Sequence, residues 1–173
     1  MSGLGHFAPA FTAKSVNQTV PFWVWLVASE ANDILYILFS ATGIEPKTKI
    51  TVMDFQSGVR YLTPVVSPWS HGLFMSVFWS VIASTIAFLI YRNRHTSALI
   101  GLVVLSHWIL DFLMHSNLPV FFSDSPQVGL GLENTGIGFL VMTSLDILLL
   151  ITGVVIYVAA RRRSRQNLEP VHV

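Results

Sequence analysis

The residues of this sequence best suited to chemistry lie in one run of ten, SHWILDFLMH at positions 106–115. Its ionisable residues His107, Asp111 and His115 are spaced four apart, and four residues advance an α-helix by only about 40° beyond a full turn. They therefore share one face of a predicted helix that is otherwise apolar. An imidazole and a carboxylate at this spacing can bind one divalent cation. The alternative is a hydrogen-bonded stripe that holds membrane helices together.

Four apolar stretches predict the helices that would position these residues. Residues 71–91, 97–116 and 136–160 are each close to the 20 or so apolar residues that a membrane span needs. A fourth predicted span, residues 20–42, starts with an aromatic anchor of Phe22, Trp23 and Trp25. Near its middle it carries Glu30 and Asp33, which are costly in a bilayer unless they face a partner or a polar cavity. We predict an all-α polytopic membrane bundle of a single domain, with four transmembrane helices and a short amino-terminal helix.

The composition agrees with a membrane protein. Of the 173 residues, 53% are hydrophobic and only 11% are charged, whereas soluble domains have about 25% charged residues. A mean hydropathy of +0.62 excludes an intrinsically disordered chain. The net charge of +1 provides no basic field for nucleic acid. Because the chain has no cysteine, metal or catalytic chemistry must come from His, Asp and Glu.

Basic residues predict the orientation of the spans. Seven of them, including Lys14, Arg92 and Arg161, fall on one side, and three fall on the other. Because cytoplasmic flanks are enriched in Lys and Arg, both termini are predicted to be cytoplasmic, with a tail over residues 161–173. The loops around residues 44–70 and 117–135 would lie outside, and the first of them has room for a short β-hairpin. The first 18 residues lack the pattern of a cleaved signal peptide, so we expect the whole chain to be the mature protein.

Depth along the spans indicates which polar groups would meet the stripe. At about 1.5 Å per residue, Asp33 and Asp111 lie about 20 Å above the cytoplasmic ends, His107 about 15 Å and His115 about 27 Å. His71 begins its span from outside. It would lie at the mouth of the same cavity or else be an ordinary interfacial histidine.

Two further acidic residues lie within predicted spans. Glu30 is one turn below Asp33 on the same face, where it can orient a ligand or carry a proton. Asp146 lies midway along the last span, and the alternative for it is pairing with a neighbouring helix without chemistry.

The amino-terminal segment contains His6 in a short apolar stretch, residues 5–14. One reading is an amphipathic helix on the cytoplasmic membrane surface. The other is a half-membrane hairpin that turns near Asn17 and raises His6 to about 18 Å, level with Asp33. The residues alone leave both open.

Four short motifs occur in a recognisable order: GHF at 5–7, NDI at 32–34, SHG at 70–72 and SHWILD at 106–111. With them, residues 5–160 resemble the bacterial inner-membrane proteins described as membrane-bound metal-dependent hydrolases. Asn32 and Leu35 stand where that family usually has Pro and a second Asp. The resemblance implies a multi-pass protein of the cell inner (plasma) membrane. It also implies a metal site made of His6, Asp33, His71, His107 and Asp111.

This ligand set favours particular ions. Three histidines and two carboxylates suit zinc, with manganese or iron as alternatives, and disfavour calcium and magnesium. A catalytic ion would keep a position for water and lower its pKa towards about 7. His115 is then the predicted proton shuttle, and Glu30 or Ser70 would orient the ligands.

The function expected from this site is hydrolysis of an ester or phosphoester in an amphipathic or lipid-linked substrate that enters from the outer leaflet. The alternative is a metal-ion or proton transporter or channel, because intramembrane His and Asp also mark ion pathways. Four spans would form a pore only as an oligomer. Bis-histidine haem binding is a weaker hypothesis, since haem has no need of the carboxylates beside its ligands. A fourth hypothesis is a structural membrane protein whose polar groups only pack against one another.

Overall fold

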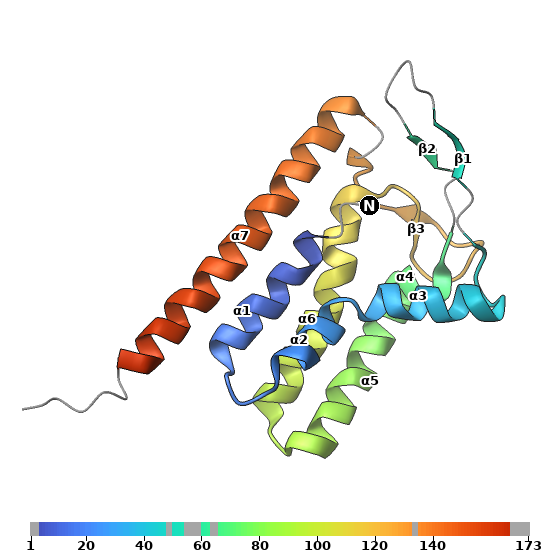
Figure 1. Ribbon diagram of the computed structural model, residues 1–173. Coiled ribbons are helices and arrows are strands. Elements are labelled where there is room, and N and C mark those ends of the chain that lie inside the picture. Colours follow the sequence, from blue (N-terminus) through green and yellow to red (C-terminus); the bar gives the residue numbers. More distant parts are fainter. Residues whose placement is uncertain (1–3, 48–49, 54–59, 63–65, 133–134, 167–173) are drawn as a thin grey trace, which may run out of the picture.

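The computed structural model describes residues 4–47, 50–53, 60–62, 66–132 and 135–166. This part of the chain is mostly helical, with seven α-helices, one 3-10 turn and two small antiparallel sheets (Figure 1). The helical elements are η1 (Gly5–Phe7), α1 (Ala8–Val16), α2 (Phe22–Ser29), α3 (Ala31–Thr42), α4 (Pro68–His71), α5 (Leu73–Tyr91), α6 (Arg94–Met114) and α7 (Gly136–Gln166). The strands are β1 (Ile50–Met53), β2 (Arg60–Leu62), β3 (Leu118–Pro119) and β4 (Gln127–Val128).

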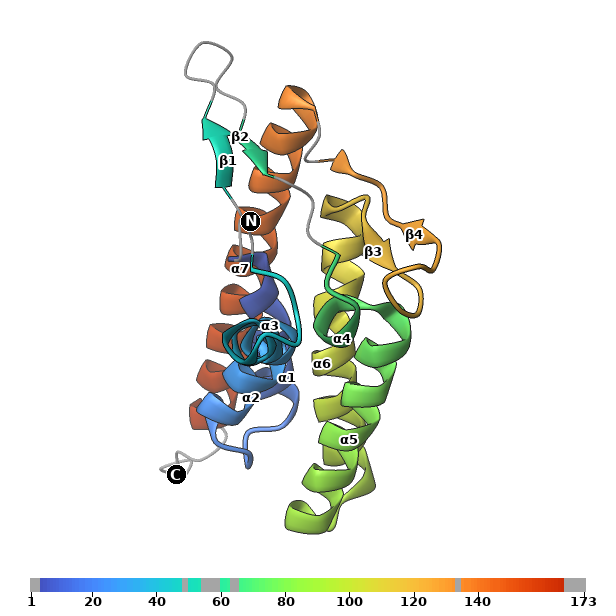
Figure 2. The ribbon, with the colours of Figure 1, turned by 90° about the vertical axis from the view of Figure 1, so that its right-hand side faces the viewer.

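Helix α6 lies at the centre of the bundle, between α5 on one side and α1 and α2 on the other (Figure 2). It begins after Asn93, whose side chain accepts a hydrogen bond from the Thr96 amide at 3.0 Å, as an N-cap residue does. Close packing against α5 depends on Gly101, where a Cβ would lie 3.0 Å from the Ser80 carbonyl oxygen. The Ser80 hydroxyl donates to the Gly101 carbonyl at 2.7 Å. Small residues let two helix backbones approach in this way.

The amino-terminal segment is a hairpin within the bundle. Helix α1 packs against α2 and α7, as both views show (Figures 1 and 2). The turn is held by Asn17, whose Nδ2 donates to Thr96 Oγ1 at 2.7 Å. Lys14 Nζ donates to the Gln18 and Val20 carbonyls. The segment therefore folds back against the bundle, as the hairpin arrangement requires, and its depth in the membrane stays a prediction.

The first predicted span is not one straight helix. Helices α2 and α3 meet at Glu30 with a bend of 60°, and α3 leaves the bundle sideways (Figure 1). Of the described residues, only α5, α6 and α7 are individually long and apolar enough to cross a membrane, and the α2–α3 pair is a broken span or a re-entrant loop. A sequence window averages apolar character over 20 residues, so it does not detect a change of direction at one of them.

The surfaces of the long helices indicate association with a membrane. Only 17% of the apolar window is buried in α5 and in α7, against 44% in α6. Contiguous apolar surface on this scale is rare on soluble proteins. Helix α7 continues to Gln166, so the first six residues of the predicted cytoplasmic tail, 161–166, are helical. Residues 167–173 lie outside the described part.

Two short hairpins connect the helices. Strands β1 and β2 pair Ile50 with Leu62, which is the hairpin for which the loop at residues 44–70 had room. The segment that follows β4 is attached to the carboxyl end of α6, because the amides of Leu130 and Gly131 donate to the carbonyls of Phe112 and His115. His115 is thereby held just beyond the end of α6.

Candidate metal centre

Asp111 lies at the centre of a buried cluster of histidines. Its Oδ1 atom is 3.4 Å from His6 Nε2 and 3.5 Å from His115 Nε2. Its Oδ2 atom is 3.4 Å from His71 Nε2 and 3.5 Å from His107 Nε2. Four imidazoles, from η1, from α4, from α6 and from just beyond α6, therefore turn the same ring nitrogen towards one carboxylate.

Asp33 on α3 adds a second carboxylate. Its Oδ1 atom is 3.2 Å from His71 Nε2 and 3.6 Å from His107 Nε2. The side chains of Asp33 and His115 are each 20% exposed, whereas those of His107 and Asp111 are 0% and 3% exposed. The cluster is thus closed around Asp111 and reaches the surface at Asp33 and His115.

These separations fit metal ligands better than hydrogen bonds. Ligand atoms about 2.05 Å from a tetrahedral zinc ion are about 3.3 Å apart, and the six pairs above lie between 3.2 and 3.6 Å. Hydrogen bonds from nitrogen to oxygen are usually about 2.7 to 3.2 Å, a range that only the pair His71–Asp33 reaches. Within the described residues, the Nε2 atoms of His6 and His107 are buried without a hydrogen-bond partner. Buried polar atoms rarely remain in that state, so the donor set fits a divalent metal ion.

The break between α2 and α3 orients His107. Its Nδ1 lies 2.8 Å from the carbonyl oxygen of Ser29, the last residue of α2. In an uninterrupted helix that carbonyl would accept from the amide four residues later. Here it accepts the Nδ1 proton of His107, which leaves the Nε2 lone pair directed at Asp33 and Asp111. The bend at Glu30 therefore makes the Ser29 carbonyl available to set the orientation of His107.

A relay of three side chains orients His71. Its Nδ1 is 2.8 Å from Ser70 Oγ, which lies 2.7 Å from Glu45 Oε2. Because the Glu45 carboxylate only accepts, Ser70 donates to Glu45 and accepts from His71, and the His71 Nε2 lone pair is free for a metal. Glu45 also caps α4 by accepting from the amides of Trp69 and Ser70. Partners of this kind set the tautomer of metal-binding histidines.

Glu45 is the site residue that the sequence did not reveal. It is 2% exposed, although it lies three residues after the end of α3 in a segment expected to be an outer loop. Glu45 is not spaced from the other site residues by multiples of a helical turn. The only sign of it in the sequence was therefore a lone carboxylate between Ile44 and Pro46. Ser70, one of the two predicted orienting residues, is in contact with His71.

The hairpin of α1 and α2 brings His6 into the cluster. Its ring stacks on that of His107, with centroids 4.1 Å apart and an angle of 14° between the planes. Asp146 on α7 lies beside the preceding residue, Gly5, so closely that a Cβ there would collide with its carboxylate. Asp146 is buried, and in this position it packs against the backbone that carries His6.

Glu30 and Asn32 flank the cluster at the helix break. One carboxylate oxygen of Glu30, Oε1, is buried and makes no hydrogen bond with described residues. Glu30 lies within electrostatic range of His107 and His6. Asn32 is fully buried and donates from Nδ2 to Ser76 Oγ on α5 at 3.0 Å, which ties the start of α3 to the bundle.

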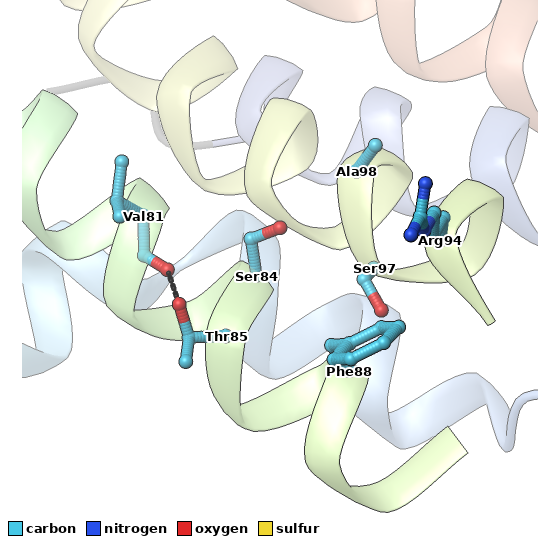
Figure 3. A pocket seen from close by; sticks show the side chains of 7 residues that line it. All are labelled: Val81, Ser84, Thr85, Phe88, Arg94, Ser97 and Ala98. Atoms are coloured by element: carbon cyan, nitrogen blue, oxygen red, sulfur yellow. Dashed lines mark hydrogen bonds between the residues drawn. The ribbon is translucent and has the colours of Figure 1, made fainter. Parts of the chain in front are cut away.

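A surface groove lies towards the other end of the α5–α6 hairpin, apart from this cluster. It is lined by Val81, Ser84, Thr85 and Phe88 of α5 and by Arg94, Ser97 and Ala98 of α6 (Figure 3). None of the seven is a predicted site residue, and Arg94 is 17 positions before Asp111 on the same helix. The groove is therefore not the entrance to the metal centre.

Comparisons with known proteins leave the chain without an assigned relative, because no protein-family model, curated protein or solved structure matches it.

Proposed function

We propose that this protein is a membrane-embedded metal-dependent hydrolase that cleaves an ester or phosphoester of an amphipathic or lipid-linked substrate. The observation that carries the proposal is the convergence of four imidazole Nε2 atoms and two carboxylates at 3.2 to 3.6 Å in the interior of an apolar bundle. The resemblance to bacterial inner-membrane metal-dependent hydrolases supports it, as does the fit of this donor set to zinc, manganese or iron.

The fixed orientation of the histidines favours a resident ion over a transported one. His107 and His71 are each held through Nδ1 by buried partners, Ser29 and Ser70. A transport site must bind weakly enough to release its ion and must connect to both sides. On the side of His107 towards the amino end of α6, the bundle is filled by apolar side chains. Among them are Trp25, Val103 and Val104, which are at most 4% exposed. These contacts support a site that opens on one side only.

A bound divalent ion supplies Lewis-acid activation of water and of the ester that the water attacks. Asp33, His71, His107 and Asp111 hold the ion in this proposal, and His6 closes the site from the amino-terminal hairpin. Glu30 accepts the proton of the attacking water, since its buried Oε1 has no competing partner among the described residues. It then returns that proton to the alcohol as the bond to the leaving oxygen breaks.

Apolar side chains near the cluster support an amphipathic substrate. Trp69, next to Ser70 in α4, is 39% exposed and lies 5.2 Å from Phe122 between ring centroids. Phe121 and Phe122 of the β3–β4 loop are 53% and 47% exposed. Exposed aromatic rings are typical of the interface between bilayer and water. A substrate with an acyl or prenyl chain can insert the chain beside these rings while its polar ester reaches Asp33.

The test is to separate metal binding from hydrolysis with Glu30→Gln. We expect purified wild-type protein in detergent to carry zinc and to hydrolyse one class within a panel of long-chain and short-chain esters and phosphoesters. Glu30→Gln should keep its metal and lose activity by about 10²- to 10⁴-fold, the usual contribution of a general base. Asp124→Asn is the matched control, because Asp124 is exposed in the β3–β4 loop and its change should leave both properties intact.

Two outcomes would contradict the proposal. Wild-type protein that binds no divalent metal after reconstitution would remove the metal centre. Zinc flux into vesicles that carry the reconstituted protein, together with no hydrolysis across the panel, would assign the cluster to transport.

A further inference from the structure

We propose that the centre holds two metal ions, bridged by the carboxylate of Asp111, and that His115 and His6 are ligands of the second ion. This inference rests on the proposed metal site and adds to it a stoichiometry, a ligand and a narrower substrate class.

The two oxygens of Asp111 face different pairs of histidines. Oδ2 faces His71 and His107 at 3.4 and 3.5 Å, and Asp33 stands 3.2 and 3.6 Å from the same two nitrogens. Oδ1 faces His6 and His115 at 3.4 and 3.5 Å. Three further donors, from His71, His107 and Asp33, therefore gather on the side of Oδ2, and two, from His6 and His115, gather on the side of Oδ1. The ligand atoms of His6, His107 and Asp111 also lie within 4.8 Å of one another, so the two sets adjoin at His107.

A single ion cannot use all of these donors. The four histidines, Asp33 and the two Asp111 oxygens present seven donor atoms, whereas protein-bound zinc is almost always four-coordinate. His107 cannot be shared between two ions, because its Nδ1 is committed to the Ser29 carbonyl and only Nε2 remains. A carboxylate has two oxygens and can bind one ion with each. Asp111 is thus the residue able to serve both sets.

The second set has fewer protein donors than the first. The first set has four protein donors and can complete a tetrahedral shell, as structural zinc sites do. Among the described residues, the second set consists of His6, His115 and Asp111 Oδ1, and three protein ligands plus one position for water or substrate characterise catalytic zinc. The side chain of His115 is 20% exposed, as is that of Asp33 in the first set, so a substrate ester that reaches Asp33 lies at the same opening of the cluster. This assignment replaces the role of proton shuttle that the sequence predicted for His115.

Two bridged ions favour a phosphoester over a carboxylic ester. Paired ions about 3.5 to 4 Å apart stabilise both the attacking and the leaving oxygen of an in-line displacement at phosphorus. The oxygen of water forms the new bond to phosphorus, and the bond to the alcohol oxygen breaks. Glu30 takes the proton from the water and delivers it to the departing alcohol, so no further reactant is needed.

The number of metal ions bound per chain tests the two-ion centre directly. Protein purified in detergent is stripped with a chelator, reconstituted with Zn²⁺ or Mn²⁺, desalted and assayed for metal per chain by mass spectrometry. We expect two ions per chain in the wild type and one in His115→Ala. His95→Ala is the matched control, because His95 lies exposed on the same helix, α6, and it should keep two.

The Mn²⁺ form adds a readout that requires no variant. Two carboxylate-bridged Mn²⁺ ions couple magnetically and weaken the six-line electron paramagnetic resonance signal of an isolated ion. His115→Gln serves in place of His115→Ala if the alanine variant does not fold.

The possible results separate the two proposals. One ion per chain in the wild type, with an isolated Mn²⁺ spectrum, overturns the second ion and leaves the metal centre standing. Two ions that persist in the His115 variant overturn its role as a ligand. No bound metal in the wild type overturns the metal centre and the second ion together.

Discussion

The relay behind His71 can be tested with Ser70→Ala, a change that keeps every predicted ligand in the chain. Ser70 is fully buried, and its hydroxyl joins Glu45 Oε2 at 2.7 Å to His71 Nδ1 at 2.8 Å. Alanine removes both contacts but keeps the backbone amide of residue 70, which donates to Glu45 Oε1 at 2.9 Å. The cap of α4 should therefore survive, while His71 loses the partner that directs its Nε2 towards the metal.

The expected effect follows from the loss of one outer-shell partner. Such losses weaken metal binding by about 10- to 100-fold, which corresponds to about 1.4 to 2.7 kcal/mol. At a free zinc concentration 100 times the wild-type Kd, bound zinc adds about 2.7 kcal/mol to the free energy of unfolding. In Ser70→Ala, the same zinc concentration should add only about 0.4 to 1.4 kcal/mol.

Two measurements check these values. Titration against a chromophoric chelator gives the zinc affinity, and thermal unfolding with and without zinc gives the stabilisation by the ion. Ser80→Ala is the control, because it also removes a hydroxyl hydrogen bond, the one to Gly101, at the α5–α6 contact. It should lower stability with and without zinc alike. Wild-type zinc affinity and zinc-dependent stabilisation in Ser70→Ala would refute the orienting relay.

Three further predictions concern the ligands and the topology. Asp111→Asn should lower metal affinity by more than about tenfold without preventing membrane insertion, and an affinity equal to that of Asp124→Asn would remove Asp111 from the ligands. His6→Ala should weaken binding and lower the melting temperature at fixed zinc, because a bound ion stabilises only while it is bound; unchanged metal content and melting temperature would remove His6. Ser116→Cys, exposed just beyond His115, should react with an impermeant thiol reagent from outside the cell, and labelling from the cytoplasmic side alone would reverse the predicted orientation. Ser70 is a poor site for this labelling because it is fully buried.

The sequence determined those features that depend on local periodicity. Apolar windows located α5, α6 and α7 to within a few residues at most ends, because a helix that faces lipid needs a continuous apolar stretch. The spacing of His107, Asp111 and His115 placed them on one face, because four residues are close to one helical turn. Asp33 could be matched to this stripe by depth, because the rise per residue of a helix is constant.

Tertiary contacts decided the rest. The bend at Glu30, which frees the Ser29 carbonyl for His107, arises where α2 and α3 pack in different directions. Glu45 reaches Ser70 across 25 positions of sequence, a contact that no period encodes. The carboxylate of Asp111 has each of its oxygens facing a different pair of histidines only once η1, α4 and α6 are assembled around it. A helix repeat fixes which side chains share a face, whereas the direction of each ligand atom depends on the partners that the folded chain brings to it.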